Sequence, residues 1–217
     1  MQKGLLSIYK PLGITSYDVI RVLKKHFPGE KIGHGGTLDP LAEGVLVVAV
    51  GREATKQLHS VLNGTQKEYR AKIELGKTSE TDDAEGPITD YAGGNGTIPS
   101  RDDVEKALRN FVGDITQTPP DYSAVKVQGM TAYKRARTGQ KIALAPKQVH
   151  IVSIDVQSYT YPTLEIKVVC GSGVYIRALA RDLGEALKTG AYLTGLQRTR
   201  VGDFTSDTAL QLDSFKD

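Results

Sequence analysis

The sequence has one cysteine, little net charge and no long hydrophobic run, and each of these absences excludes a class of protein. Cys170 alone cannot form an intrachain disulfide framework or a cysteine-rich metal site. The longest apolar run, Val45–Val50, has the length of a strand, whereas a membrane span needs roughly 18 to 20 apolar residues. The N-terminus lacks the apolar centre and cleavage site of a secretory signal. We therefore expect a cytoplasmic protein without a membrane segment.

The charge balance is only a weak sign of nucleic-acid binding. The 28 Lys and Arg residues oppose 25 Asp and Glu residues, a net charge of +3, whereas proteins that bind many phosphates are usually far more basic. Charge alone favours solvated surfaces over RNA contacts for the basic clusters. These clusters are Lys67, Arg70 and Lys72; Lys134, Arg135 and Arg137; and Arg198 and Arg200.

Strands and helices are intermixed along the 217 residues, a length that suits one domain with a substantial core or two small domains. Hydrophobic periodicity, caps and turn residues predict strands over 5–9, 45–50, 68–75, 122–127, 150–159, 164–170 and 191–197. The same signals predict helices over 16–27, 55–62, 100–111, 131–138 and 173–187. The polar, glycine-rich segment 77–99 is expected to be a mobile loop. Because neighbouring strands are joined as hairpins, we expect an α+β domain on a mixed, mainly antiparallel sheet.

Two periodic segments carry candidate functional side chains. In the strand 68–75, Tyr69 falls on the same face as three apolar residues, which by itself indicates a core tyrosine. In the helix 173–187, Arg177 lies beside the apolar stripe and not on it, which by itself indicates an exposed arginine.

Asp39 lies between Leu38 and Pro40 in a glycine-rich segment, residues 33–44, that leads into a buried strand. Glycines remove side-chain bulk and Pro40 fixes its own φ, so this segment can hold one functional side chain on a rigid support. However, Asp before Pro also commonly begins a turn, and spacing alone favours that interpretation. The glycine spacing matches neither the dinucleotide-binding nor the phosphate-loop pattern.

The segment GHGGTLDPLAEGVL at 33–46 resembles the G-H-x-G-T-L-D-P-x-A-x-G-V/L-L signature of the TruB family of tRNA pseudouridine synthases. Five more segments resemble motifs of this family in the family's order: KPLGITS at 10–16, GREATK at 51–56, KEYR at 67–70, PPDYSAVKVQG at 119–129 and GVYIRALARDLG at 173–184. Together they extend over nearly the whole chain and are highly specific. The resemblance implies the pseudouridine synthase fold, with helices and loops flanking the sheet.

The resemblance implies that Asp39 is the catalytic carboxylate for isomerising uridine to pseudouridine at position 55 in the T loop of tRNA. The reaction breaks the N-glycosidic bond, turns the uracil and rejoins it through C5, without a metal or a cofactor. Asp39 could attack C6 of the base, attack C1′ of the ribose, or remove the 2′ proton. Each role requires an ionised carboxylate, and the resemblance assigns Arg177 as its positive partner.

The resemblance also assigns substrate-binding roles. It implies that Tyr69 stacks on the target base and shuttles a proton, that Tyr175 lies near the pocket, and that Leu196 packs against the uracil. His34 is expected to stack in the RNA loop and help to trap the flipped nucleotide. Lys56 is expected to contact a backbone phosphate. The base must leave its stack to react, and aromatic and apolar side chains can replace the lost stacking.

The chain departs from the family pattern in a few places. Gly35 stands where Thr is common, Tyr192 where His is common, and Asp121 where an apolar residue is usual. We expect residues 1–217 to form a single catalytic domain with an RNA-gripping insertion at 119–150, and no C-terminal PUA domain. The expected enzyme is a monomer that binds the T-arm of tRNA without an obligatory protein partner. Two alternatives are a tRNA-binding folding helper with secondary catalysis and a relative that depends on a guide RNA.

Overall fold

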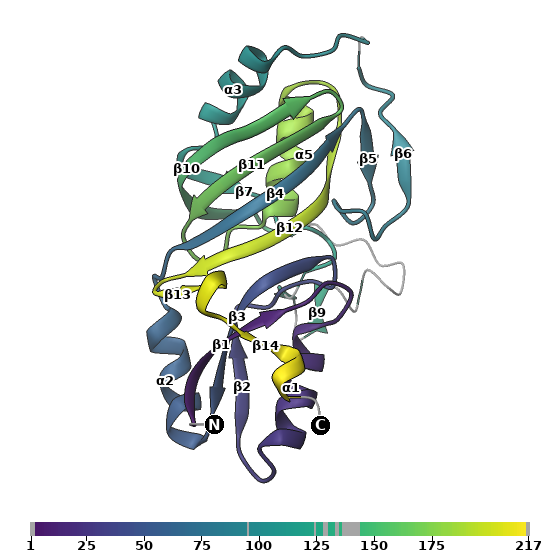
Figure 1. Cartoon of the computed structure of the whole chain (residues 1–217). Coiled ribbons are helices and arrows are strands. Elements are labelled where there is room, and N and C mark those ends of the chain that lie inside the picture. Colours follow the sequence, from purple (N-terminus) through teal and green to yellow (C-terminus); the bar gives the residue numbers. More distant parts are fainter. Residues whose placement is uncertain are drawn as a thin grey trace. The chain divides into compact units, whose positions relative to one another are not determined.

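The computed structural model describes residues 3–94, 96–123, 125–127, 130–132, 135 and 144–215 (Figure 1). Contacts within the chain define two compact units. Unit 1 comprises Met1–Arg70, Val169–Ser172 and Leu196–Asp217, and unit 2 comprises Ala71–Val168 and Gly173–Gly195. Strands β4 (Lys67–Leu75), β11 (Thr163–Cys170) and β12 (Ala191–Val201) contribute residues to both units.

Unit 1 is built around the long strand β3. Its elements are β1 (Gly4–Lys10), α1 (Ser16–His26), β2 (Ile32–Gly35), β3 (Ala42–Val50), α2 (Arg52–Leu62), β13 (Phe204–Thr205), η1 (Ser206–Thr208), β14 (Leu210–Gln211) and η2 (Leu212–Phe215). The strand order is β14-β1-β3-β12, with β2 on β3 and β13 on β12. β1 pairs antiparallel along one edge of β3. The other edge pairs in parallel with β12 at residues 42–44 and antiparallel with β2 at residues 47–50.

The apolar run in β3 is buried on both faces of the sheet. Leu46 and Val48 point into a core formed with α1, η2 and Ile8. Val45 and Val47 point to the opposite face, where α2 contributes half-buried leucines. A strand covered on both faces needs apolar side chains at successive positions, which is why this segment does not alternate.

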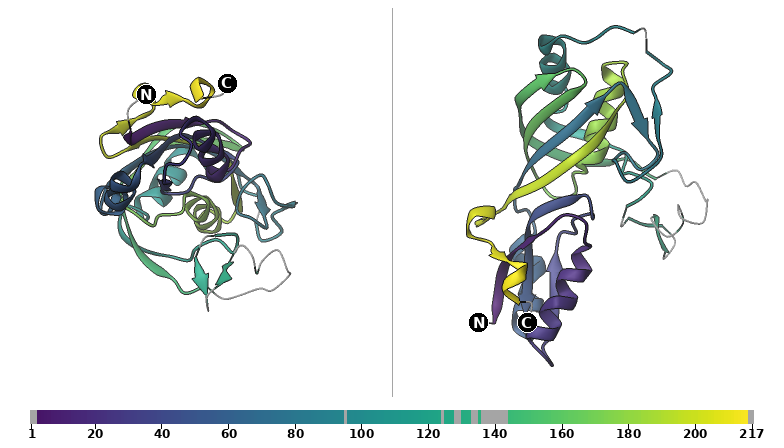
Figure 2. Two further views of the ribbon diagram at one scale, coloured as in Figure 1. Left: turned by 90° about the horizontal axis from the view of Figure 1, so that it is seen from below. Right: turned by 45° about the vertical axis from the view of Figure 1, so that its right-hand side comes forward.

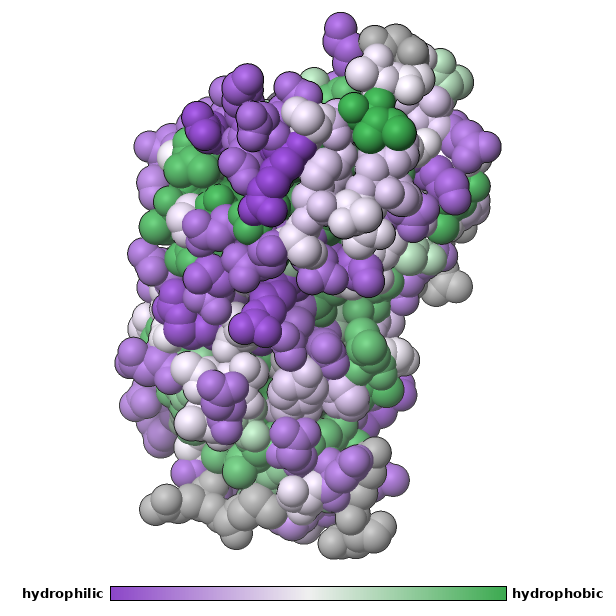
Figure 3. All heavy atoms as spheres, turned by 45° about the horizontal axis from the view of Figure 1, so that its top comes forward, coloured by the Kyte–Doolittle hydropathy of each residue, from purple (hydrophilic) through white to green (hydrophobic). Residues whose placement is uncertain are grey.

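Unit 2 is a sheet with helix α5 against one face (Figure 2). Its strand order is β12-β4-β11-β10-β7. The further elements are β5 (Lys77–Ser79), β6 (Ile88–Asp90), α3 (Arg101–Arg109), β7 (Gly113–Gln117), β8 (Lys126–Val127), β9 (Met130–Thr131), β10 (Lys147–Thr160) and α5 (Ile176–Ala186). Seen from the side of α3, the surface is mainly hydrophilic with scattered apolar patches (Figure 3). Helix α3 itself buries only Val104 and Leu108.

Most predicted elements are confirmed, including the mixed, mainly antiparallel sheet of an α+β fold. The capping boxes form at Thr15–Asp18 and Ser100–Asp103. The loop predicted over 77–99 is wrong in part, because β5 and β6 pair there as a small sheet. β2, β7, β9, β13 and β14 were not predicted, and the strand expected over 122–127 is limited to β8. Most of the helix expected over 131–138, with Lys134 and Arg137, lies outside the described residues.

No helix within the described ranges is both long and apolar enough to cross a membrane.

Candidate active site

The loop that carries Asp39 connects β2 to the beginning of β3. The Asp39 carbonyl accepts a hydrogen bond from the Ala42 amide at 3.0 Å, which closes a tight turn into β3. The Pro40 carbonyl accepts a bond from the Gly13 amide at 2.9 Å. Both interpretations of the Asp-Pro pair are therefore compatible, because Asp39 begins a turn and is also held on a rigid strand end.

Ser16 holds the residue that precedes Asp39. Its hydroxyl donates to the Leu38 carbonyl at 3.0 Å and accepts from the Leu38 amide at 2.8 Å. Ser16 is only 2% exposed and is the first residue of α1, and Leu38 is buried beside it. The sequence identified Ser16 only as part of the motif at 10–16 and as the start of a helix, since one residue cannot reveal a contact made across 22 positions.

Arg198 holds the same loop from the other side. Its Nη2 donates to the Gly36 carbonyl at 2.8 Å and its Nε to the Val45 carbonyl at 2.7 Å. The interpretation of Arg198 as a solvated or phosphate-binding residue is wrong, because its side chain is only 1% exposed. A buried guanidinium must satisfy its donors within the protein, and here it does so on both sides of Asp39.

Two glycines of the segment allow this arrangement. Gly36 has φ +73°, and a Cβ there would lie 3.3 Å from the Arg198 guanidinium. Gly44 has φ +103°, and a Cβ there would lie 2.2 Å from the Arg198 carbonyl oxygen. The glycines therefore permit left-handed backbone and the close approach of β12 to β3.

Tyr69 lies on the buried face of β4, as its alternation with apolar residues predicts, and is 7% exposed. Burial raises the pKa of its phenol, the charge of Arg198 counteracts this, and the charge of Asp39 adds to the increase in pKa. The hydroxyl therefore stays protonated at neutral pH. Asp39, Tyr69 and Arg198 form one electrostatic group within unit 1.

The other predicted site residues of unit 1 differ in their surroundings. Leu196 is half-buried on β12, in register with Ala42 just after the Asp39 loop. His34 is half-buried on β2, and its Nδ1 has no hydrogen-bond partner among the described residues. Burial and the charge of Arg198 lower the pKa of His34, so its ring is neutral at physiological pH. Lys56 is exposed on α2 and pairs with Glu53 at 2.9 Å.

Lys67 and Cys170 belong to the same electrostatic group as Tyr69 and Arg198. Burial lowers the pKa of Lys67, and the charge of Arg198 lowers it further. Burial raises the pKa of Cys170 to about 12, so the thiol is not ionised near neutrality. Neither a thiolate nucleophile nor an exposed phosphate-binding lysine is therefore present at these positions. The described part of the chain holds no group of three or more His, Cys, Asp or Glu residues arranged to bind a metal.

In unit 2, Arg177 is held by a polar loop. It is 6% exposed, pairs with Asp83 at 3.5 Å, and donates to the carbonyls of Thr81 at 3.0 Å and Tyr122 at 2.8 Å. The interpretation of Arg177 as an exposed helical residue is wrong. Its pairing with Asp39 stays a prediction. Asp83 was missed by the sequence analysis, because an acid in a polar segment gives no sign of burial.

Tyr175 is the N-cap residue of α5, and the side chain of Gln117 bonds its backbone at two points. Gln117 accepts from the Tyr175 amide at 2.8 Å and donates to its carbonyl at 3.0 Å. Neighbouring Arg181 pairs with Asp82 at 2.8 Å. Burial nevertheless raises the pKa of Asp82 to about 6, against the opposing charges of Arg181 and Arg177.

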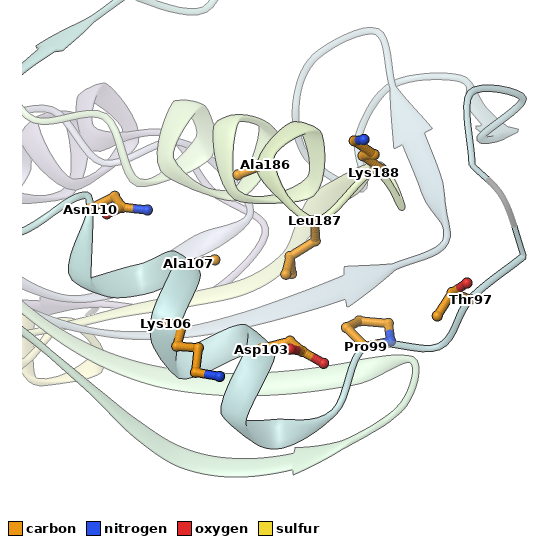
Figure 4. Close-up of a pocket in the computed structure, with 9 residues that line it drawn as sticks. All are labelled: Thr97, Pro99, Asp103, Lys106, Ala107, Asn110, Ala186, Leu187 and Lys188. Atoms are coloured by element: carbon orange, nitrogen blue, oxygen red, sulfur yellow. The ribbon is translucent and has the colours of Figure 1, made fainter.

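A cavity of about 400 Å³ lies between α3 and the end of α5 (Figure 4). Leu187 points toward α3 in this view, and Lys106 and Lys188 also line the cavity. None of the predicted site residues lines the cavity. It is therefore distinct from the groups around Asp39 and Arg177.

Comparison with protein families covers nearly the whole chain. A model described as TruB family pseudouridylate synthase (N-terminal domain) matches residues 24–176. A model described as tRNA pseudouridylate synthase B C-terminal domain matches residues 177–217.

Curated proteins named tRNA pseudouridine synthase B are similar over the same extent. The protein of Mycobacteroides abscessus is 43% identical over 99% of this chain and 72% of its own length. The protein of Bacteroides fragilis is 45% identical over 97% of this chain and 91% of its own length. The protein of Clostridium acetobutylicum is 41% identical over 99% of this chain and 72% of its own length.

Solved structures show the same fold. A chain from a Cbf5–Nop10–Gar1 complex aligns with a TM-score of 0.74 and 31% identity, covering 98% of this chain and 53% of that one. A chain from an H/ACA RNP bound to a substrate RNA containing 2′-deoxyuridine aligns with a TM-score of 0.70 and 29% identity, covering 97% and 51%. This chain thus spans about half the length of those chains. The pseudouridine synthase fold is confirmed, and with the matching family models the chain belongs to the TruB family of pseudouridylate synthases.

Proposed function

We propose that this chain isomerises uridine to pseudouridine at position 55 in the T loop of tRNA, with Asp39 as its essential carboxylate. Its membership of the TruB family and the names of its relatives support the reaction and the substrate. The observation that carries the role of Asp39 is the way its loop is held, through Leu38 by Ser16 and through Gly36 by Arg198. A carboxylate on so constrained a backbone is suited to act on one atom of a bound nucleotide.

The reaction exchanges one bond to the ribose for another. The bond from C1′ to N1 of uracil breaks and the bond from C1′ to C5 forms, while C5 loses a proton and N1 gains one. Asp39 acts as the nucleophile at C6, the nucleophile at C1′ or the base at C2′. Tyr69 keeps its proton at neutral pH and its pKa responds to the charge of Asp39, which supports a role as proton shuttle.

The target nucleotide must be flipped out of its stack, which costs a few kcal/mol. In this proposal His34, as a neutral ring, stacks within the RNA loop, and Tyr69 and Leu196 replace the stacking partners of the uracil. Arg177 pairs with Asp39, and Tyr175 lies near the same pocket. The exposed side chain of Lys56 exchanges its partner Glu53 for a backbone phosphate.

We further propose that residues 1–217 act as a single catalytic domain, as a cytoplasmic monomer without an obligatory protein partner, and that residues 119–150 grip the RNA. A dependence on guide RNA is the second candidate, because the structural relatives include a chain of an H/ACA RNP. The higher identity to proteins named tRNA pseudouridine synthase B favours direct action on tRNA.

The test is to incubate the purified chain with an unmodified tRNA transcript, without other protein or RNA, and to map pseudouridine. We expect modification at position 55 alone, and the same product from an isolated T-arm hairpin. Modification that requires an added guide RNA would support the second candidate instead. Absence of pseudouridine from every RNA tested would overturn the proposed function.

A further inference from the structure

We propose that Ser16 and Arg198 are positioning residues that fix Asp39 from the two sides of its loop. This inference rests on the proposed function and adds two residues to it. Neither residue touches the substrate in the proposal, and each acts through the backbone that carries the carboxylate.

Ser16 restrains the peptide groups on both sides of the Leu38 α-carbon. Its hydroxyl is the donor to one and the acceptor from the other, at 3.0 and 2.8 Å. The residue itself is fixed, because it begins a helix whose Val19, Ile20 and Leu23 are fully packed in the core of unit 1. The position of the Asp39 α-carbon is thereby tied to the position of α1.

Arg198 restrains the loop at points before and after Asp39. The acceptors are the carbonyls of Gly36, three residues before, and Val45, on β3. The rigid, planar fork of a guanidinium can bond both at once, whereas the single ammonium of a lysine cannot reproduce that geometry. The charge of Arg198 also lowers the pKa of the Tyr69 phenol, so one side chain acts on both the loop and the second reactive group.

The sheet of unit 1 does not depend on the side-chain contacts of Ser16 and Arg198. β3 is held by its backbone pairing with β1, β2 and β12 and by two apolar clusters, one on each face. The loop at 36–41 buries only Leu38 among its side chains, so its position depends mainly on hydrogen bonds, those of Ser16 and Arg198 among them. Loss of the hydrogen bonds of either Ser16 or Arg198 should therefore move Asp39 more than it alters the fold.

The expected effect is on the chemical step and not on RNA binding. A displacement of about 1 Å at a reacting group can lower a rate by ~100-fold. We expect Ser16→Ala and Arg198→Lys each to lower the single-turnover rate on a T-arm hairpin by ~10- to 100-fold. The dissociation constant for the hairpin should change by less than about threefold, because no proposed RNA contact is removed.

Matched variants separate positioning from general destabilisation. Ser7→Ala is the control for Ser16→Ala, because the Ser7 hydroxyl is buried in the same unit without a partner among the described residues. Arg200→Lys is the control for Arg198→Lys, because Arg200 lies on the same strand and is half-exposed. Among the described residues its side chain makes one hydrogen bond, of 3.4 Å, to the Gly202 carbonyl. Both controls should retain the wild-type rate.

The pKa of His34, followed by NMR of its ring protons, separates the charge of Arg198 from its geometry. Arg198→Gln removes the charge and should raise the pKa of His34, whereas Arg198→Lys should leave it near the wild-type value. A slow Arg198→Lys enzyme with an unchanged His34 pKa would show that the geometry of the fork matters.

The outcomes are distinguishable from failure of the proposed function. A wild-type chain without activity on tRNA refutes the function itself. If the wild-type chain is active, a Ser16→Ala or Arg198→Lys variant that folds and reacts within twofold of the wild-type rate overturns the positioning role of the substituted residue. If neither variant folds, both residues are structural and the proposal is wrong.

Discussion

Replacing Gly44 by Ala tests whether the backbone contact between β3 and β12 sets the register of the site. Gly44 lies opposite Arg198, with φ +103° and no room for a Cβ, which would lie 2.2 Å from the Arg198 carbonyl oxygen. A residue other than glycine in left-handed backbone costs about 1–2 kcal/mol. The clash adds to this, because the two strands must move apart before a Cβ can fit.

Gly113→Ala is the matched control for this substitution. Gly113 has nearly the same dihedral, φ +97°, but a Cβ there would meet nothing within 4 Å. We expect Gly113→Ala to lower the free energy of unfolding by about 1–2 kcal/mol, through backbone strain alone. Gly44→Ala should lower it by at least about 3 kcal/mol, because separating the strands also weakens ladder hydrogen bonds worth about 1 kcal/mol each.

Urea denaturation followed by circular dichroism measures both values, with single-turnover kinetics on the same samples. The account predicts that Gly44→Ala loses activity because Arg198 moves with β12, whereas Gly113→Ala stays active. Equal losses of stability in the two variants, within about 0.5 kcal/mol, would refute the argument from close approach.

Two more predictions concern Gly35 and Asp82. At Gly35, where the family commonly has Thr, a Cβ would lie 1.9 Å from the Leu62 side chain. Gly35→Thr should therefore lower the melting temperature, and adding Leu62→Ala should restore part of it. If the two substitutions change the melting temperature additively, this packing argument is contradicted. Burial raises the pKa of Asp82 from 3.8 to about 6, so its ionisation disfavours the folded state as pH rises between these values. Relative to Asp82→Asn, the unfolding free energy of the wild type should fall by on the order of 2–3 kcal/mol from pH 4 to pH 7. If the difference in unfolding free energy between the two proteins does not vary with pH, the raised pKa of Asp82 is contradicted.

The sequence predicted those features that depend on local patterns. The alternation in β4 placed Tyr69 on the buried face, and the capping residues located the starts of α1 and α3. These signals are local because side-chain direction and cap bonds are decided within a few residues.

The sequence did not predict features that depend on distant contacts. Charged side chains are usually exposed, so nothing near Arg198 or Arg177 in the sequence revealed that each is buried against carbonyl groups. β2 was missed because its glycines disfavour a strand, and pairing with β3 overrides that preference. β7 and the pair β5–β6 are short and depend on their partners in the same way.

The candidate site was predicted unevenly for the same reason. The motif around Asp39 identified the carboxylate, but the residues that hold it, Ser16 and Arg198, come from both ends of the chain. Their roles became apparent only when the fold brought them to Leu38 and Gly36.

The most direct test of the account is to replace Asp39 by Asn and to measure both hairpin binding and pseudouridine formation, with the exposed acid Asp90 replaced by Asn as the control. Asn keeps the size of the side chain and removes its charge, so we expect binding within about threefold of wild type and no detectable product, while Asp90→Asn behaves as wild type. Pseudouridine formed by Asp39→Asn at a rate near that of wild type would contradict the central claim that this carboxylate performs the chemistry.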